Sequence, residues 1–156
     1  MKISIAKIIL SGLLSGLAAF SFAATPNLDP IVGKWKTVDD RTGYSRADVM
    51  VKKNSDGTYT GTIIETRAVP GRAKMEICTN CPGELKNRPF VGLPFVFGFK
   101  QNPDNPYEYV DGKILDPIGG KIYKGKARIT ANGRHMTLRG YVGVSMLGRS
   151  VTWIKY

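Results

Sequence analysis

Residues 121–143 read KIYKGKARITANGRHMTLRGYVG, and this stretch decides the fold class. Two runs that favour strands, 121–130 and 135–143, lie on either side of Asn132-Gly133. Asn-Gly readily adopts the positive φ angles of a tight hairpin turn. A closing run follows over 150–156. The last third of the chain is therefore expected to form antiparallel strands.

The same pattern continues toward the N-terminus, where Asp56-Gly57 is another strong hairpin signal. Helical periodicity is hard to find after residue 26, because Gly and Pro recur too often for long helices. β-branched and aromatic residues dominate the intervals between them, which is typical of strands. About eight strands are expected, over 33–38, 46–53, 58–66, 90–100, 107–115, 121–130, 135–143 and 150–156.

Most of these strands are joined by short turns, and short links favour up-and-down antiparallel pairing. Eight strands are enough to close a barrel and so remove the exposed sheet edges. The prediction is an all-β fold, a single antiparallel up-and-down β-barrel of about eight strands. A flat β-sandwich is the alternative architecture.

The N-terminus has the three parts of a cleavable signal peptide. Lys2 and Lys7 form a basic segment, and an apolar stretch over 8–22 follows it. That stretch is shorter than the roughly 20 residues of a membrane-spanning helix, although a retained anchor is the alternative. Cleavage is expected after Ala23, which leaves one domain over 24–156 in the periplasm or outside the cell.

Without the leader the chain has 21 basic and 12 acidic residues, a net charge of +9. A basic excess of that size attracts anionic partners such as envelope components or an acidic small ligand. Nucleic acid is a poor candidate for an exported protein. The basic residues are spread along the chain, so a plain solvated surface is the competing interpretation.

Several spaced motifs resemble a family of small exported bacterial proteins, the domain-of-unknown-function 2147 family. They cover most of the mature chain, and they are Gly33-x-Trp35-x-Thr37-x-Asp39-Asp40-x-Thr42-Gly43, Cys78-x-x-Cys81, Lys86-Asn87-x-Pro89, Asp111-Gly112-Lys113-Ile114-Leu115-Asp116-Pro117, Gly120-Lys121-x-Tyr123, Arg139-Gly140-Tyr141-x-Gly143 and Gly148-Arg149-x-x-x-Trp153. The resemblance implies a lipocalin-like, calycin-type barrel and no settled activity. Lipocalins also begin with Gly-x-Trp, with the Trp packed beneath a basic side chain from the last strand, so Trp35 is expected to meet Arg149 or Lys155.

Cys78-Thr79-Asn80-Cys81 is the motif most suggestive of chemistry. In an oxidising compartment two such close cysteines are normally paired, so a small structural disulfide is expected. A redox role would require a helix N-terminus, whereas this motif lies in a segment rich in Pro and Gly. Metal binding is the third interpretation, but the chain's single His brings the total of Cys and His to only three, whereas zinc takes about four ligands.

Aromatic side chains are the better functional lead, because an eight-stranded barrel can hold one small ligand. The predicted ligand-binding residues, at the barrel interior or its mouth, are Trp35, Tyr59, Phe95, Phe97, Tyr123, Arg139, Tyr141, Arg149 and Trp153. Phe95, Phe97 and Phe99 stand at period two and are expected to share one strand face. The competing interpretation is a barrel filled by its own side chains.

Three functions remain open on the sequence. The first is an exported lipocalin-like carrier for a small hydrophobic or amphipathic ligand, with or without an acidic end, and without cofactor or metal. The second is a cell-envelope interaction protein with a filled barrel, docking through its basic surface and the 67–89 loop. The third is an enzyme in which acidic residues converge with Tyr123 or His135, the acids being Asp39, Asp40, Asp111 and Asp116. Each of those acids stands in a predicted turn, where Asp commonly caps the backbone.

Overall fold

Eight strands and one short 3-10 helix make up the computed structural model, which describes residues 29–156 except Ser145. The predicted leader over 1–23 lies outside the described residues. The elements are β1 (Gly33–Val38), β2 (Ala47–Lys53), β3 (Tyr59–Thr66), η1 (Gly83–Leu85), β4 (Pro94–Asn102), β5 (Asn105–Leu115), β6 (Ile122–Ile129), β7 (His135–Tyr141) and β8 (Gly148–Lys155).

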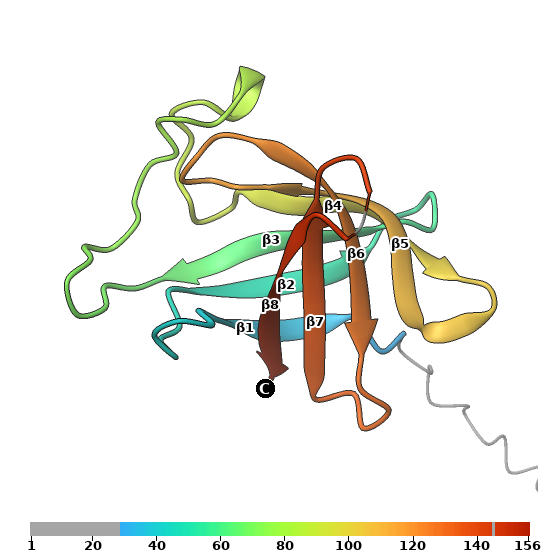
Figure 1. The fold of residues 1–156 in the computed structure, drawn as a ribbon. Helices are drawn as coiled ribbons and strands as arrows, with labels where there is room; N and C mark the ends of the chain where they lie inside the picture. The colour runs from blue at the N-terminus through green and yellow to red at the C-terminus, as the bar shows by residue number, and fades with distance from the viewer. Residues whose placement is uncertain (1–28, 145) are drawn as a thin grey trace, which may run out of the picture.

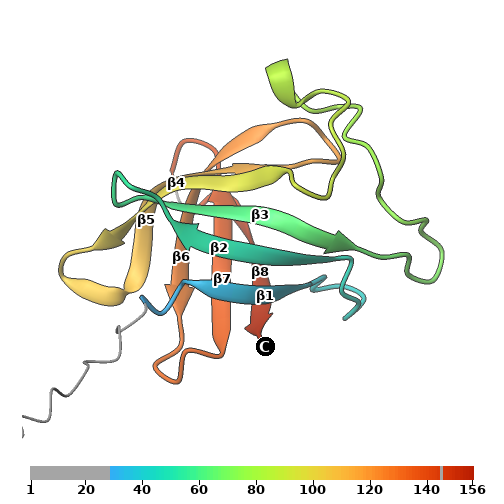
Figure 2. The same ribbon diagram turned by 180° about the vertical axis from the view of Figure 1, so that it is seen from behind.

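Each strand pairs antiparallel with the next, and β8 pairs back onto β1, so the sheet closes on itself (Figures 1 and 2). In the closing ladder Thr37 lies opposite Trp153, and Trp35 lies opposite Lys155. The predicted up-and-down barrel of eight strands is thereby confirmed, and the sandwich alternative is wrong. No helix among the described residues is long and apolar enough to cross a membrane.

The two ends of the barrel differ in the length of their connections. At one end, here called the closed end, β2–β3, β4–β5 and β6–β7 are joined by connections of two to five residues. The other end, here called the mouth, carries the connections 39–46, 67–93, 116–121 and 142–147. The 67–93 connection is the longest, and it extends away from the barrel beside the β5–β6 turn (Figure 1).

The half of the barrel near the closed end is filled by its own side chains. Phe99 occupies the interior where Gly112 and Gly125 leave room for its ring, since a Cβ at Gly112 would lie 2.3 Å from Phe99 Cδ2. Tyr59 and Tyr109 pack edge to face beside it, with ring centroids 5.1 Å apart. The hydroxyl of Tyr59 donates to Asp29 at 2.7 Å, which satisfies its polar end.

Trp35 closes this end of the barrel, as the resemblance implied. It is fully buried, and its Nε1 donates to the carbonyl of Ile31 at 2.8 Å. The basic partner is Lys155, whose Nζ lies 5.2 Å from the Trp35 ring centroid and donates to the carbonyl of Pro30 at 2.9 Å. Burial lowers the pKa of Lys155. Of the two expected partners, Arg149 is not used and lies at the mouth instead.

The expectation that Phe95, Phe97 and Phe99 share one face is wrong. Register shifts on either side of Val96 and a positive φ at Gly98 interrupt the alternation of β4. As a result Phe99 joins the barrel core, whereas Phe97 packs against a second apolar cluster under the 67–93 connection. Bulges of this kind change which face a side chain occupies.

Candidate ligand-binding site

The mouth half of the barrel is hollow. Two adjoining spaces, together called the mouth cavity, have volumes of about 610 Å³ and 230 Å³. They share three apolar wall residues from different strands, Ile114, Leu138 and Val151. Volumes of several hundred Å³ with mostly apolar walls are typical of small-molecule sites.

The two spaces face opposite sides of the mouth. The larger one is bounded by β6, β7 and β8, and its further lining residues are Asp116, Tyr123, Gly140, Tyr141, Val142, Leu147, Gly148 and Arg149. The smaller one is bounded by β1 to β4 and the turn after β5, and its further lining residues are Thr37, Val38, Asp39, Tyr44, Arg46, Ala47, Ile63, Met75, Phe95, Pro117 and Trp153.

Trp153 and Leu138 form the floor of the mouth cavity. Both residues also line a void of about 10 Å³ on the other side, inside the filled half of the barrel. Phe95 packs on Trp153 with ring centroids 5.6 Å apart. The hollow therefore ends at these side chains, and a ligand that enters at the mouth would meet a flat aromatic base.

Two arginines stand in the cavity wall. Arg149 pairs with Asp40 at 2.5 Å, and this partner raises the pKa of Arg149. Arg46 donates from NH2 to the carbonyl of Ala73 at 3.0 Å. Its Nε is buried and has no hydrogen-bond partner among the described residues. A buried donor without an acceptor costs about 1–3 kcal/mol, and because this Nε has almost no accessible surface it is not open to a ligand in the cavity. What Arg46 offers a ligand is the positive charge of its guanidinium in the wall of the smaller space.

The acidic residues near the mouth hold turns together. Asp39 accepts hydrogen bonds from the backbone N–H groups of Arg41 and Thr42, which lower its pKa. Asp116 accepts one from the N–H of Ile118 at 3.0 Å. These are the turn-capping roles that the sequence favoured. His135 begins β7 at the closed end of the barrel. Tyr123 on β6 and Asp116 after β5 lie at the opposite end, at the mouth.

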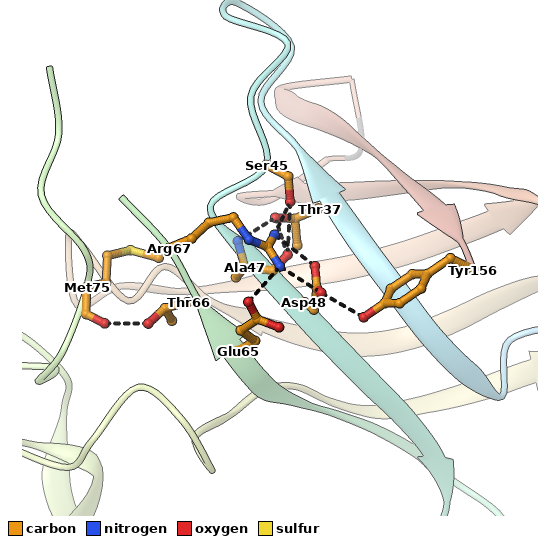
Figure 3. Close-up of polar contacts among 9 residues, drawn as sticks. All are labelled: Thr37, Ser45, Ala47, Asp48, Glu65, Thr66, Arg67, Met75 and Tyr156. Atoms are coloured by element: carbon orange, nitrogen blue, oxygen red, sulfur yellow. Dashed lines mark hydrogen bonds and ion pairs between the residues drawn. The ribbon is translucent and has the colours of Figure 1, made fainter. Parts of the chain in front are cut away.

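A polar frame on the outer surface connects β2 with the end of β3 and with the C-terminal residue Tyr156 (Figure 3). Asp48 is buried, and its carboxylate accepts from Arg67 at 2.7 Å and from the Tyr156 hydroxyl at 2.7 Å. Burial acts to raise the pKa of Asp48, but the hydrogen bonds from Arg67 and Tyr156 outweigh it and lower the pKa overall. Arg67 also donates to Ser45 at 2.7 Å. The frame thus ties the C-terminus and the end of β3 to β2.

The 67–93 connection forms one wall beside the mouth. Cys78 and Cys81 are bonded in the expected disulfide, and both are buried in the second apolar cluster. Asn80 Nδ2 donates to the carbonyl of Ile118 at 2.8 Å. A Cβ at Gly120 would lie 1.8 Å from the Asn80 carbonyl oxygen, so only glycine permits this approach. The disulfide therefore shapes a loop that is docked on the β5–β6 turn.

The structure brings five of the nine predicted ligand-binding residues to the mouth cavity, namely Phe95, Tyr123, Tyr141, Arg149 and Trp153. The other four lie elsewhere: Trp35 in the closed end, Tyr59 at the small void, Phe97 against the second cluster, and Arg139 in an outer groove beside Lys126 and Arg128. Whether any of the nine contacts a ligand stays a prediction.

Sequence reasoning did not find Arg46 or the three shared wall residues. Leu138 and Val151 stand at inward positions of β7 and β8, so strict alternation along the predicted strands was the available signal. Arg46 carried no such signal, because its place at the cavity depends on the path of the 39–46 connection. The sequence analysis assigned ligand contact mainly to aromatic residues, whereas aliphatic residues supply the wall that the two spaces share.

Comparisons with known proteins agree with this geometry. The profile of a family described as "Uncharacterized protein conserved in bacteria (DUF2147)" matches residues 33–155, so the chain belongs to that family. No curated protein matches the sequence. Among solved structures, protein HP1028 from the human pathogen Helicobacter pylori, described as belonging to the lipocalin family, is similar with a TM-score of 0.66 and 20% identity over 80% of this chain and 82% of that one. At that identity the likeness supports the lipocalin-like fold alone.

Proposed function

We propose that this DUF2147 protein is an exported binding protein or carrier for a small amphipathic molecule with an apolar body and an anionic end. The single observation that carries the proposal is the mouth cavity, an apolar hollow with two arginines in its wall. Eight-stranded barrels of lipocalin type commonly hold one small ligand in this way. The anionic end is inferred from the charge and donors of Arg46 and Arg149.

The geometry assigns a part of the ligand to each region. The apolar body packs on Leu138, Val151 and the Trp153 floor, where contact removes apolar surface from water. The anionic end is attracted by the guanidinium of Arg46, which lines the smaller space and forms no ion pair with a carboxylate among the described residues. Arg149 is the second anchor, but a ligand has to displace Asp40 from it. Arg46 is therefore the primary anchor in this proposal.

The alternative, an envelope-docking protein with a filled barrel and no ligand, requires the interior to be occupied by side chains throughout. Only the half near the closed end meets that requirement. Ile77 and Val91 on the 67–93 connection are each 52% exposed, which favours docking through that connection. The carrier function accounts for the hollow half and is the one we adopt.

Export is part of the proposal and has its own test. The signal peptide predicts that the protein isolated from the periplasm or medium starts at Ala24. Intact mass measurement of that protein gives its N-terminus directly. A mass that includes residues 1–23, with the protein retained in the membrane, would contradict cleavage.

Binding is tested by filling the cavity at Gly140. A Cβ there would lie 3.6 Å from Ile114 Cδ1 and 3.6 Å from Tyr123 Cβ, which are ordinary contacts. Gly140→Ala should therefore leave the cavity open, whereas the longer side chain of Gly140→Leu should occupy the larger of its two spaces, the one that Gly140 lines. With a fluorescent long-chain fatty acid as probe, we expect Gly140→Leu to bind at least about tenfold more weakly than Gly140→Ala, a loss of about 1.4 kcal/mol.

Both variants are compared with the unaltered protein by circular dichroism and thermal unfolding, so that a folding defect is recognised. Equal probe affinity for the Leu and Ala variants, with both folded, would contradict binding in the larger space of the mouth cavity. Absence of probe binding by the unaltered protein would contradict this ligand class.

A further inference from the structure

The connection between β7 and β8 exposes apolar side chains to solvent. Met146 is 88% exposed and Val144 is 61% exposed, and Val142 and Leu147 are also largely uncovered. A single exposed apolar residue is ordinary on a protein surface, but several gathered in one connection indicate an interaction site. The part of this connection that follows β7, residues 142–144, rises beyond the end of that strand at the mouth (Figure 1).

The outer face of β5, β6 and β7 carries a cluster of cations, here called the basic face. Lys113 lies directly opposite Lys124, and Lys126 lies directly opposite Arg139. Like charges directly opposite each other on neighbouring strands are destabilising. In the part of the chain that the structure describes, no carboxylate forms an ion pair with Lys113, Lys124 or Lys126. An anionic surface would relieve this repulsion.

The apolar connection and the basic face are joined in space. Arg139 donates from NH1 to Ser150 Oγ at 3.0 Å and from NH2 to the carbonyl of Met146 at 3.1 Å. Tyr141, where the connection leaves β7, lies opposite Lys124 on β6. The two features therefore adjoin each other on the same side of the barrel.

We propose that the 142–147 connection and the basic face dock on an anionic lipid bilayer. Apolar side chains that flank a cationic surface insert at the boundary between headgroups and acyl chains, while lysines contact the phosphates. The protruding shape of the connection and the lack of carboxylates paired with the three lysines fit a phospholipid surface. The net charge expected for the mature chain, +9, has the same sign.

This proposal rests on the proposed function in one respect. Val142 and Leu147 of the same connection also line the mouth cavity. A bilayer contacted by the connection therefore adjoins the cavity entrance, which deepens the ligand class to an amphiphile drawn from, or delivered to, the membrane. Docking itself needs no ligand and is measured separately.

The test uses the full mature protein and vesicle flotation. Vesicles of phosphatidylcholine alone are compared with vesicles of phosphatidylcholine mixed with phosphatidylglycerol, and the fraction of bound protein is measured as the salt concentration rises. We expect binding to the anionic vesicles only, with the electrostatic part weakened by salt. The proposal would be overturned if the protein bound neither kind of vesicle. That is the result expected if a protein partner or a second copy covers the connection.

Two double variants locate the surface. Val144→Asp with Met146→Asp alters the connection at residues that do not line the cavity, and Lys124→Glu with Lys126→Glu reverses the basic face. Each pair should weaken binding to anionic vesicles at least about tenfold. The matched control is Ile77→Asp with Val91→Asp, at apolar residues that are exposed on the 67–93 connection instead. Unaltered binding by either test pair, or loss only in the control pair, would overturn the assignment.

The fatty-acid probe separates this proposal from the proposed function. Val144→Asp with Met146→Asp should lose vesicle binding and keep probe affinity in solution, whereas Gly140→Leu should show the reverse. Loss of probe binding with intact docking contradicts the carrier function alone. Intact probe binding without docking contradicts the membrane surface alone.

Discussion

Arg46 shows how one residue in an irregular segment gives the cavity its chemical character. The apolar walls accept any hydrophobic body of suitable size, but the positive charge of Arg46 in the wall favours a ligand with an anionic end. The guanidinium is held in place by its hydrogen bond to the carbonyl of Ala73. Specificity for an acidic end therefore depends on Arg46 more than on the aromatic residues.

The first prediction removes that cation. Arg46→Met keeps an unbranched apolar side chain of similar length and should weaken binding of a fluorescent fatty acid about tenfold, since a hydrogen bond to a charged group contributes about 1.5–3 kcal/mol. Affinity for the methyl ester of the same probe should change little. Titration of both probes measures the difference. An equal loss for acid and ester would indicate damage to the wall and not loss of an anchor.

The second prediction concerns Asp48 and the pH dependence of stability. The pKa of Asp48 is lower in the folded protein than in the unfolded chain, so the ionised carboxylate stabilises the fold above about pH 4. That contribution is lost as the pH falls through the lowered folded pKa. Asp48→Asn should lower the free energy of unfolding by about 2 kcal/mol near neutral pH. Denaturant unfolding of both proteins between about pH 7 and about pH 3 should show the difference shrinking.

Arg67→Lys serves as the control for charge at this frame, because it keeps the cation but not the second guanidinium donor that reaches Ser45. The role given to the ionised carboxylate would be contradicted if the free energies of unfolding of Asp48→Asn and of the unaltered protein differed by the same amount over the whole pH range.

At the scale of elements, the hairpins could be predicted because their turns are local. Asn132-Gly133 and Asp56-Gly57 both form the expected tight turns, each with its glycine at positive φ. The predicted strand over 90–100 begins too early, since β4 starts at Pro94 and residues 90–93 form a turn. Phe90 and Leu93 belong to the 67–93 connection and are buried in the second apolar cluster, not within the sheet. An apolar run indicates burial but not the surface that buries it.

The third prediction concerns the disulfide in that connection. Cys78→Ala with Cys81→Ala should lower the free energy of unfolding by about 2 kcal/mol or less, because the bond closes a very short loop. The barrel should stay folded while the connection loosens. Hydrogen exchange should therefore accelerate at the N–H groups of Cys78 and Asn87, which now bond to the Arg88 and Cys78 carbonyls. Faster exchange in β6 and β7 as well would contradict a purely local role.

At the scale of the whole molecule, eight strands predict closure but not the filling of the barrel. The closed half is filled because Phe99 fits against Gly112 and Gly125, whereas Gly140 and the aliphatic side chains of Leu138 and Val151 leave the mouth half hollow between its aromatic residues. Sequence patterning showed which residues face inward in many strands, but not at what height along the barrel axis they meet. The cavity, its floor and Arg46 therefore required the three-dimensional arrangement.

Native mass spectrometry of the protein purified without detergent from its own host tests the central claim most directly. We expect the unaltered protein to carry the added mass of one small molecule that organic solvent releases, and Gly140→Leu prepared in parallel to carry none. The carrier function would be contradicted if the unaltered protein had only the mass of the mature polypeptide with its one disulfide.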